Sequence, residues 1–147
     1  LRCLVGSEMC IRDRVSAIIR NLKEKAMNVE EFREYCLSFR GVQEKMPFLD
    51  VADQYSRDVL CFYVGSKWFC FVNIEVFDFC CLKCEPERNL ELQETYQGIK
   101  PGWHMNKRHW MSVHFNQDVP DNMVKELVRQ SYDIVYRTLS KKEKELM

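Results

Sequence analysis

Two apolar runs separated by a Gly-Ser pair constrain the fold of this chain more than any other stretch of its sequence. Residues 58–74 read DVLCFYV-GS-KWFCFVNI, and each run has the length and the aromatic and β-branched content of a strand. A two-residue connection that begins with glycine is typical of a β-hairpin. Because both faces of the runs are apolar, we expect an antiparallel sheet that is covered on at least part of each side.

Helices are predicted before and after this hairpin in the sequence. Apolar residues recur at helical spacing over 29–38, after the capping residue Asn28, and Gly41 ends that helix. Pro86 opens a helix over 86–96, and Asp121, after Pro120, is predicted to cap a long last helix. The buried stripe of the last helix is Val124, Leu127, Val128, Ser131, Val135 and Leu139. The tail KKEKELM is predicted to fray.

The remaining apolar segments predict further strands. Residues 45–50 read as a short edge strand, because proline at position 47 cannot donate to a central ladder. Residues 78–84 and 109–115 read as strands, and 98–108 reads as a loop. The order is helix, three or four antiparallel strands, helix, strand, helix. This order predicts a single α+β domain with helices packed on an antiparallel sheet.

The first 26 residues differ in character from the rest. LVGSEMCIRDR, residues 4–14, resembles translated adaptor sequence, and we expect the native protein to begin at Met27, with 1–26 as read-through and 27–147 as the domain. The alternative is a genuine amphipathic helix over 15–26 that docks on the body. No leader of adequate apolar length and no run of about 20 apolar residues is visible, which predicts a cytoplasmic protein without a membrane partner.

Charge argues against an extended phosphate-binding surface. The chain has 22 basic and 22 acidic side chains. Six of the basic and three of the acidic residues precede Met27, so the body has 16 and 19, a net charge of −3. A protein that tracks phosphates usually has a basic surplus or a basic face, and only a local face is left open here.

The cysteines are expected to be reduced and structural, because disulfides are rare in the cytoplasm. Cys81 and Cys84 form a C-x-x-C pair, but a spacing of three on a strand puts them on opposite faces. A hairpin with a two-residue turn pairs positions whose numbers sum to 131. Cys61 and Cys70 would then lie directly opposite each other, close enough for a disulfide if oxidised.

Neither a metal site nor a cofactor site is predicted. His109 and His114 would face opposite sides of one strand, so with His104 they make a poor ligand set. A Cys/His nucleophile pair stays open, although no elbow or protease motif accompanies it. The five glycines form no phosphate-cradling loop.

The stretch PGWHMNKRHW, residues 101–110, concentrates aromatic and polar groups. Trp110 is predicted to be a core anchor, while Lys107 and Arg108 are predicted to be an exposed rim. A rim of aromatic and basic groups side by side suits a nucleic-acid or ligand contact. The candidate contacts are Lys67, Lys83, His104, Asn106, Lys107 and Arg108.

Five segments in order carry a family resemblance. They are EYCLSFRGVQEKMPF, VGSKWFCFV, LKCEPERNLEL, YQGIKPGWHMNKRHWMSV and VKELVRQSYDIVYRTL. The body resembles the MmcQ/YjbR family of small bacterial proteins, although Arg40-Gly41 stands where the family often has Pro-Gly. The resemblance implies an α+β fold similar to those of frataxin/CyaY and type III secretion chaperones. It also implies a DNA-binding label and no established catalytic residues.

These observations favour a non-enzymatic, cytoplasmic binding module whose partner is DNA. The first alternative is a protein-interaction module resembling a secretion chaperone, which the net charge of −3 favours. The second is an enzyme that uses the 104–110 loop. The oligomeric state is left open.

Overall fold

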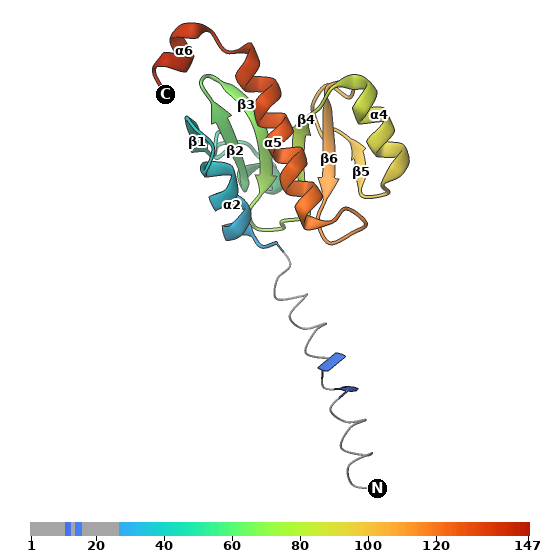
Figure 1. Ribbon diagram of the computed structural model, residues 1–147. Coiled ribbons are helices and arrows are strands. Elements are labelled where there is room, and N and C mark those ends of the chain that lie inside the picture. Colours follow the sequence, from blue (N-terminus) through green and yellow to red (C-terminus); the bar gives the residue numbers. More distant parts are fainter. Residues whose placement is uncertain (1–10, 13, 16–26) are drawn as a thin grey trace, which may run out of the picture.

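A six-stranded antiparallel sheet organises the molecule, in the strand order β1-β2-β3-β4-β6-β5 (Figure 1). The computed structural model describes residues 11–12, 14–15 and 27–147, so the expectations for residues 1–26 lie largely outside the described residues. The strands are β1 (Val42–Lys45), β2 (Val59–Val64), β3 (Lys67–Asn73), β4 (Phe79–Lys83), β5 (Ile99–Pro101) and β6 (Trp110–His114). The helices of the body are α2 (Val29–Leu37), α3 (Gln54–Arg57), α4 (Pro86–Thr95), α5 (Asp121–Thr138) and α6 (Lys141–Glu145).

The β2–β3 hairpin has the predicted two-residue turn but not the predicted register. Val64 pairs with Lys67, and Gly65 adopts a φ of 61°, which glycine tolerates. A β-bulge then inserts Phe69 into β3, so that Phe62 pairs with Cys70 and Cys61 pairs with Phe71. The expectation that Cys61 faces Cys70 is therefore wrong, because the extra residue shifts every later pair by one.

The shift places the two thiols on opposite faces of the sheet. Cys70 belongs to the core under the helices, whereas Cys61 belongs to a second core on the other face. All six cysteines of the body are free and buried. Cys81 and Cys84 likewise fall into different cores, as their spacing predicts.

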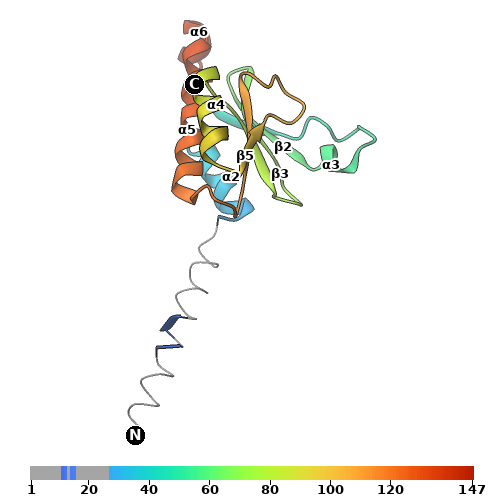
Figure 2. The same ribbon diagram turned by 90° about the vertical axis from the view of Figure 1, so that its right-hand side faces the viewer.

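Helices α2, α5 and α4 cover one face of the sheet (Figures 1 and 2). Helix α2 begins where predicted, because the Asn28 side chain accepts a hydrogen bond from the N–H of Glu31. The whole predicted stripe of α5 is buried in the larger core. Asp121 is not the cap of α5; Pro120 occupies that position, and the Asp121 carboxylate accepts from the N–H of Met27.

Ser131 is a polar residue within this apolar stripe, and it joins two strands. Its hydroxyl donates to the carbonyl of Phe69 and accepts from the N–H of Lys83, at 2.8 Å. Pairing between β3 and β4 ends at Cys70 and Leu82. The serine therefore satisfies the two backbone groups that the end of the ladder leaves unpaired.

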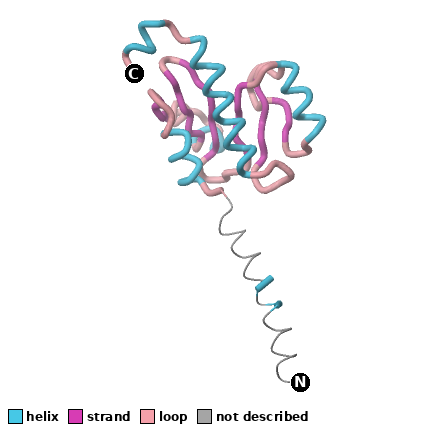
Figure 3. The backbone as a smooth tube through the Cα atoms, viewed as in Figure 1, coloured by secondary structure: helices cyan, strands magenta, loops and turns pink. Residues whose placement is uncertain are grey.

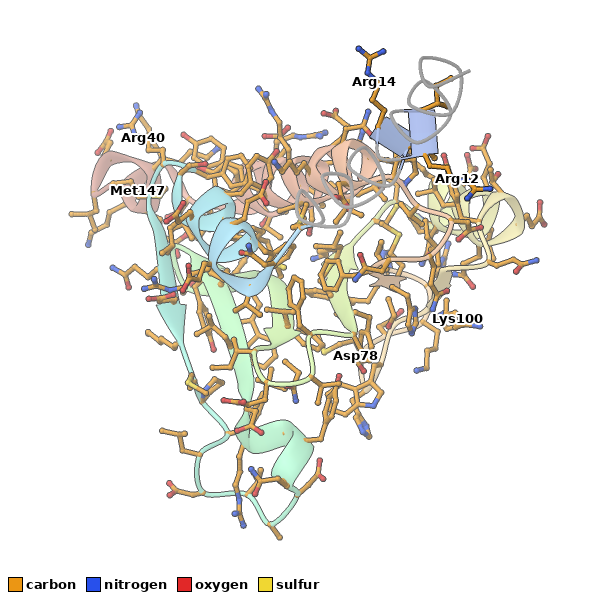
Figure 4. All side chains as sticks on the ribbon, turned by 90° about the horizontal axis from the view of Figure 1, so that it is seen from below. Arg12, Arg14, Arg40, Asp78, Lys100 and Met147 are labelled. Atoms are coloured by element: carbon orange, nitrogen blue, oxygen red, sulfur yellow. The ribbon has the colours of Figure 1, made fainter. Side chains whose placement is uncertain are left out.

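Two segments cover part of the other face. The arm, residues 46–58, contains α3, and the loop, residues 102–109, joins β5 to β6. Both project from the sheet on the side away from α5 (Figure 2). In Figure 4 the arm extends from the sheet opposite the helices, and Asp78 lies on the arm's side. The Tyr55 hydroxyl donates to Asp78 at 2.7 Å, which ties the arm to the start of β4.

Three expectations about short elements are wrong. The edge strand β1 covers 42–45 rather than 45–50, because a chain that turns at Met46 and Pro47 cannot extend the ladder. The predicted loop 98–108 begins with the edge strand β5 (Figure 3). The tail forms α6 rather than fraying, because Ser140 and Glu143 make a reciprocal capping box.

The C-terminal residue Met147 packs against Arg40 and Gly41, which directly precede β1. The side chain of Met147 lies where a Cβ on Gly41 would be, and Arg40 donates to the Met147 carbonyl at 3.2 Å. Figure 4 shows Arg40 and Met147 side by side. In the described part of the chain, no helix is long and apolar enough to cross a membrane.

Candidate nucleic-acid interface

Four of the six candidate residues lie at one end of the sheet, which we call the hairpin end. Lys67 opens β3 beside the β2–β3 turn, and Lys83 closes β4 opposite Trp110, the first residue of β6. The loop that carries Lys107 and Arg108 leads directly into Trp110. Antiparallel register therefore brings together cations that lie up to 41 positions apart in the sequence.

Lys67 reaches the end of α5 instead of pointing freely into solvent. Its ammonium donates to the Thr138 hydroxyl at 3.0 Å and, at 3.4 Å, to the Thr138 carbonyl. A cation beside the last carbonyls of a helix is favourable for the helix dipole. Arg137 precedes Thr138 and is exposed, so it extends the positive charge from the hairpin tip onto α5.

A groove of about 380 Å³ opens between α5 and the start of α4. Met111, Cys84 and Leu127 contribute apolar lining. The charged residues along it are Lys83, Arg88, Arg137, Glu85 and Asp133. Strand alternation turns the Lys83 side chain to the other face of the sheet, beside Trp110, so Arg88 and Arg137 face Glu85 and Asp133 across the groove.

The first turn of α4 borders this groove through Glu85 and Arg88. Pro86 occupies the first turn, and the capping residue Glu85 makes no side-chain capping bond. The N–H groups at the start of a helix and the positive end of its dipole favour anions. The backbone thus adds to the positive charge of Arg88, which lies on the same turn.

The loop is held rigidly by amide side chains. The Asn106 side chain accepts from the N–H groups of Arg108, at 2.9 Å, and His109, at 3.3 Å. Asn89 of α4 is buried, and its amide donates to the carbonyls of Lys107, Arg108 and Trp110. Asn106 is therefore a scaffold of the loop that presents the two cations.

Lys107 and Arg108 are exposed, as predicted. The Lys107 ammonium donates to the carbonyl of Gly102 across the loop. An ammonium group held by one carbonyl keeps its charge and two further N–H donors. Because its side chain is already held in place, it loses less conformational entropy when a ligand binds. Trp110 is 8% exposed and lies in the second core, which confirms its prediction as an anchor.

His104 lies apart from these cations. Its ring is in edge contact with Trp103, at 4.3 Å between centroids, and its backbone has a φ of 53°. Trp103 in turn contacts Tyr55 of the arm, at 5.1 Å between ring centroids. The structure therefore places His104 toward the arm and not toward the groove.

The predicted basic cluster was incomplete. Arg88 and Arg137 complete the groove, and neither was selected from the sequence. Their positions, in the first turn of one predicted helix and the last turn of another, become informative only when strand register puts both helix ends at the hairpin end. We define the basic end as Lys67, Lys83, Arg88, Lys107, Arg108 and Arg137.

The buried thiols are poorly suited to nucleophilic chemistry. Burial raises the pKa of Cys61 to about 12 and that of Cys81 to about 11, and it raises the pKa of Cys84 as well. A thiol attacks as the thiolate, so these groups are weak nucleophiles near neutral pH. Among the residues that the structure describes, no group of three His, Cys, Asp or Glu side chains could hold a metal ion.

The geometry defines an α+β domain whose sheet is covered by helices and whose exposed cations gather at one end of the sheet. The family model described as YjbR matches residues 37–134. The chain belongs to the YjbR family of small bacterial proteins.

Relatives and solved structures agree with this assignment. The chain is 30% identical over 100 residues to the uncharacterized protein YbdF of Escherichia coli O157:H7, covering 67% of this chain and 82% of YbdF. It is 24% identical to the uncharacterized protein YjbR of Escherichia coli K12, covering 82% and 98%. The crystal structure of a DUF419 protein of Deinococcus radiodurans superposes with a TM-score of 0.70 at 30% identity, covering 82% of this chain and 87% of that one. A Pseudomonas syringae protein shares the fold, with a TM-score of 0.59 at 23% identity, covering 74% and 98%.

Proposed function

We propose that the protein is a non-enzymatic, cytoplasmic module that binds nucleic acid through the basic end. The observation that carries the proposal is the convergence of six cations and the first turn of α4 at one end of the sheet. Lysine, arginine and helix N-termini are the groups that hold phosphate oxygens.

Hydrogen bonds and a shared groove link the cations into a path. Lys67 bonds to Thr138, the neighbour of Arg137, and Arg137 lines the groove together with Arg88 and Lys83. From the groove, the N–H of Cys84 donates to the carbonyl of His109 at 2.8 Å, next to Arg108. A strand of phosphates that follows this path would meet positive charge from the hairpin tip to the loop.

The acidic body is compatible with this arrangement. Phosphate contacts supply affinity locally, and a negative charge elsewhere orients the ligand toward the basic end. The two described ion pairs, Arg33–Glu44 and Lys125–Glu31, involve none of the six cations. These cations therefore keep their charge available to an anionic partner.

The test is binding of a labelled duplex DNA by matched charge variants. Lys107→Ala with Arg108→Ala should weaken binding on all sequences alike, because phosphate contacts carry no sequence information. Lys125→Ala with Arg129→Ala removes the same charge from the first part of α5 and should change affinity much less. Equal effects of both double variants would contradict a localised interface.

A protein-interaction module is the second candidate, and the arm favours it. Leu49 is 61% exposed, and Val51 on the same arm is also exposed. Exposed apolar side chains on a projecting segment suit a protein partner. Leu49→Ser with Val51→Ser should leave DNA binding unchanged if the basic end is the interface, and a loss of DNA binding in this variant would move the interface to the arm.

A further inference from the structure

On the face of the sheet away from α5, which the arm and the loop cover only in part, aromatic side chains form a strip. The strip consists of Tyr63, Trp68 and Phe71, and none of these residues belongs to the basic end. In the register of β1, β2 and β3, Gln43 pairs with Tyr63 and Tyr63 pairs with Trp68. The two rings meet edge to face, with centroids 5.7 Å apart. Both side chains are half-buried, so part of each ring lies at the surface.

The strip continues across the sheet. Trp68 contacts Phe48 of the arm at 5.8 Å and Phe71 at 6.2 Å, and Phe71 in turn contacts Trp103 of the loop at 6.3 Å. The strip is thus bordered by the arm on one side and the loop on the other. Arm and loop meet through Tyr55 and Trp103, at 5.1 Å, toward the start of β4.

Cations border the strip at the hairpin end. The Lys45 ammonium lies 5.1 Å from the centroid of the Tyr63 ring. Lys83 follows Cys81 by two positions on β4, so strand alternation directs it to the same face as Cys81 and Trp110. Lys107 belongs to the loop that projects from this face (Figure 2), and its ammonium donates to the carbonyl of Gly102 within that loop.

Carboxylates gather at the other end of the same face. Asp53 and Asp58 lie on the arm where it enters β2, and Asp78 precedes β4. The charge on this face therefore changes from negative to positive along the strands, and the half-buried rings of Tyr63 and Trp68 lie near the positive part. A phosphate backbone would be repelled from one end and attracted to the other.

We propose that this face binds single-stranded nucleic acid, with bases stacked on Trp68 and Tyr63 and the backbone along Lys45, Lys83 and Lys107. The inference rests on the proposed function and names its substrate class. Every base has a π-face, so stacking on aromatic side chains gives affinity without sequence preference. In a duplex the bases are paired and stacked on each other, so the rings would contribute only to single-strand binding.

The experiment compares a fluorescein-labelled oligothymidylate of about 12 nucleotides, within the usual site size of single-strand modules, with a duplex of equal length. We expect the full chain to bind the single strand more tightly than the duplex. Tyr63→Leu should weaken single-strand binding about 5-fold or more, the loss expected for one stacked base. Its effect on duplex binding should be small.

Tyr136→Leu is the matched control, because Tyr136 is also half-buried beneath a lysine, with Lys144 5.0 Å from its ring centroid, but lies on α5. This variant should leave both affinities within about twofold. Tryptophan emission of the wild type gives a second measurement, which does not depend on the folding of the Tyr63 variant. Adding the single strand should quench this emission. Trp68→Phe should remove most of the quenching.

The outcomes separate this inference from the proposed function. Equal affinity for the two probes, with no effect of Tyr63→Leu and a loss with Lys107→Ala and Arg108→Ala, would overturn the stacking face and keep the basic end. An absence of binding to either probe at low salt would overturn both.

Discussion

Replacing Ser131 with alanine should destabilise the protein far more than the loss of one hydroxyl suggests. Ser131 is 0% exposed, and its hydroxyl is shared between the carbonyl of Phe69 and the N–H of Lys83. Alanine leaves both backbone groups unsatisfied in an environment that excludes water. Each such group costs about 1–3 kcal/mol, so we expect the two together to cost about 2–6 kcal/mol.

Urea denaturation measures this loss directly. With a slope of about 2 kcal/mol per molar urea, the midpoint should fall by about 1–3 M while the slope stays unchanged. Ser38→Ala is the control, because Ser38 donates to the Tyr35 carbonyl at an exposed helix end. That variant should lose less than about 0.5 kcal/mol. If the two variants lose equal stability, Ser131 does not join the strands as described.

Three further outcomes are expected. Trp110→Ala should cost about 3–5 kcal/mol in the same denaturation assay, because it removes a large buried side chain and leaves a cavity in the second core. The cysteines Cys61 and Cys70 should both titrate as thiols after denaturation without reductant, since a disulfide between opposite faces of the sheet would contradict the bulged register. Desolvation raises the pKa of Asp118, but hydrogen bonds from the N–H groups of Gln97 and Gly98 outweigh it and lower the pKa overall. Its contribution to stability should therefore be present above the unfolded value near 4 and lost as pH falls through the folded value, and Asp118→Asn should flatten the acid side of a stability-against-pH curve.

Much of the fold followed from local patterns in the sequence. The Gly65-Ser66 turn, the start of α4 at Pro86 and the buried stripe of α5 each depend on neighbouring residues. Local chemistry therefore determines them, and the sequence predicts them correctly. The YjbR family and the α+β class are confirmed on the same segments.

Two of the errors arose where distant residues contribute to the local structure. The carbonyl of the bulged residue Phe69 accepts a hydrogen bond from the hydroxyl of Ser131, which is 62 positions away. Strand β5 forms because β6 offers it an edge, and three residues carry no periodic pattern of their own. The periodicity of the sequence therefore predicts neither the bulge nor strand β5.

The candidate site was predicted in part for the same reason. Lys107 and Arg108 could be selected because a dense local stretch drew attention to them. Arg88 and Arg137 could not, because only strand register and the packing of α5 bring the two helix ends to one groove. His104 was selected for its neighbours in sequence, but its ring lies against Trp103, which contacts Tyr55 of the arm.

The salt dependence of DNA binding tests the central claim most directly. Each phosphate contact contributes about 0.9 to the slope of log affinity against log salt on duplex DNA. The wild type should bind at about 50 mM salt and lose affinity steeply toward about 200 mM, and Lys107→Ala with Arg108→Ala should reduce the slope by up to about 2. An unchanged slope would remove the loop from the interface, and an absence of binding at about 50 mM salt would contradict the proposal that the basic end holds nucleic acid.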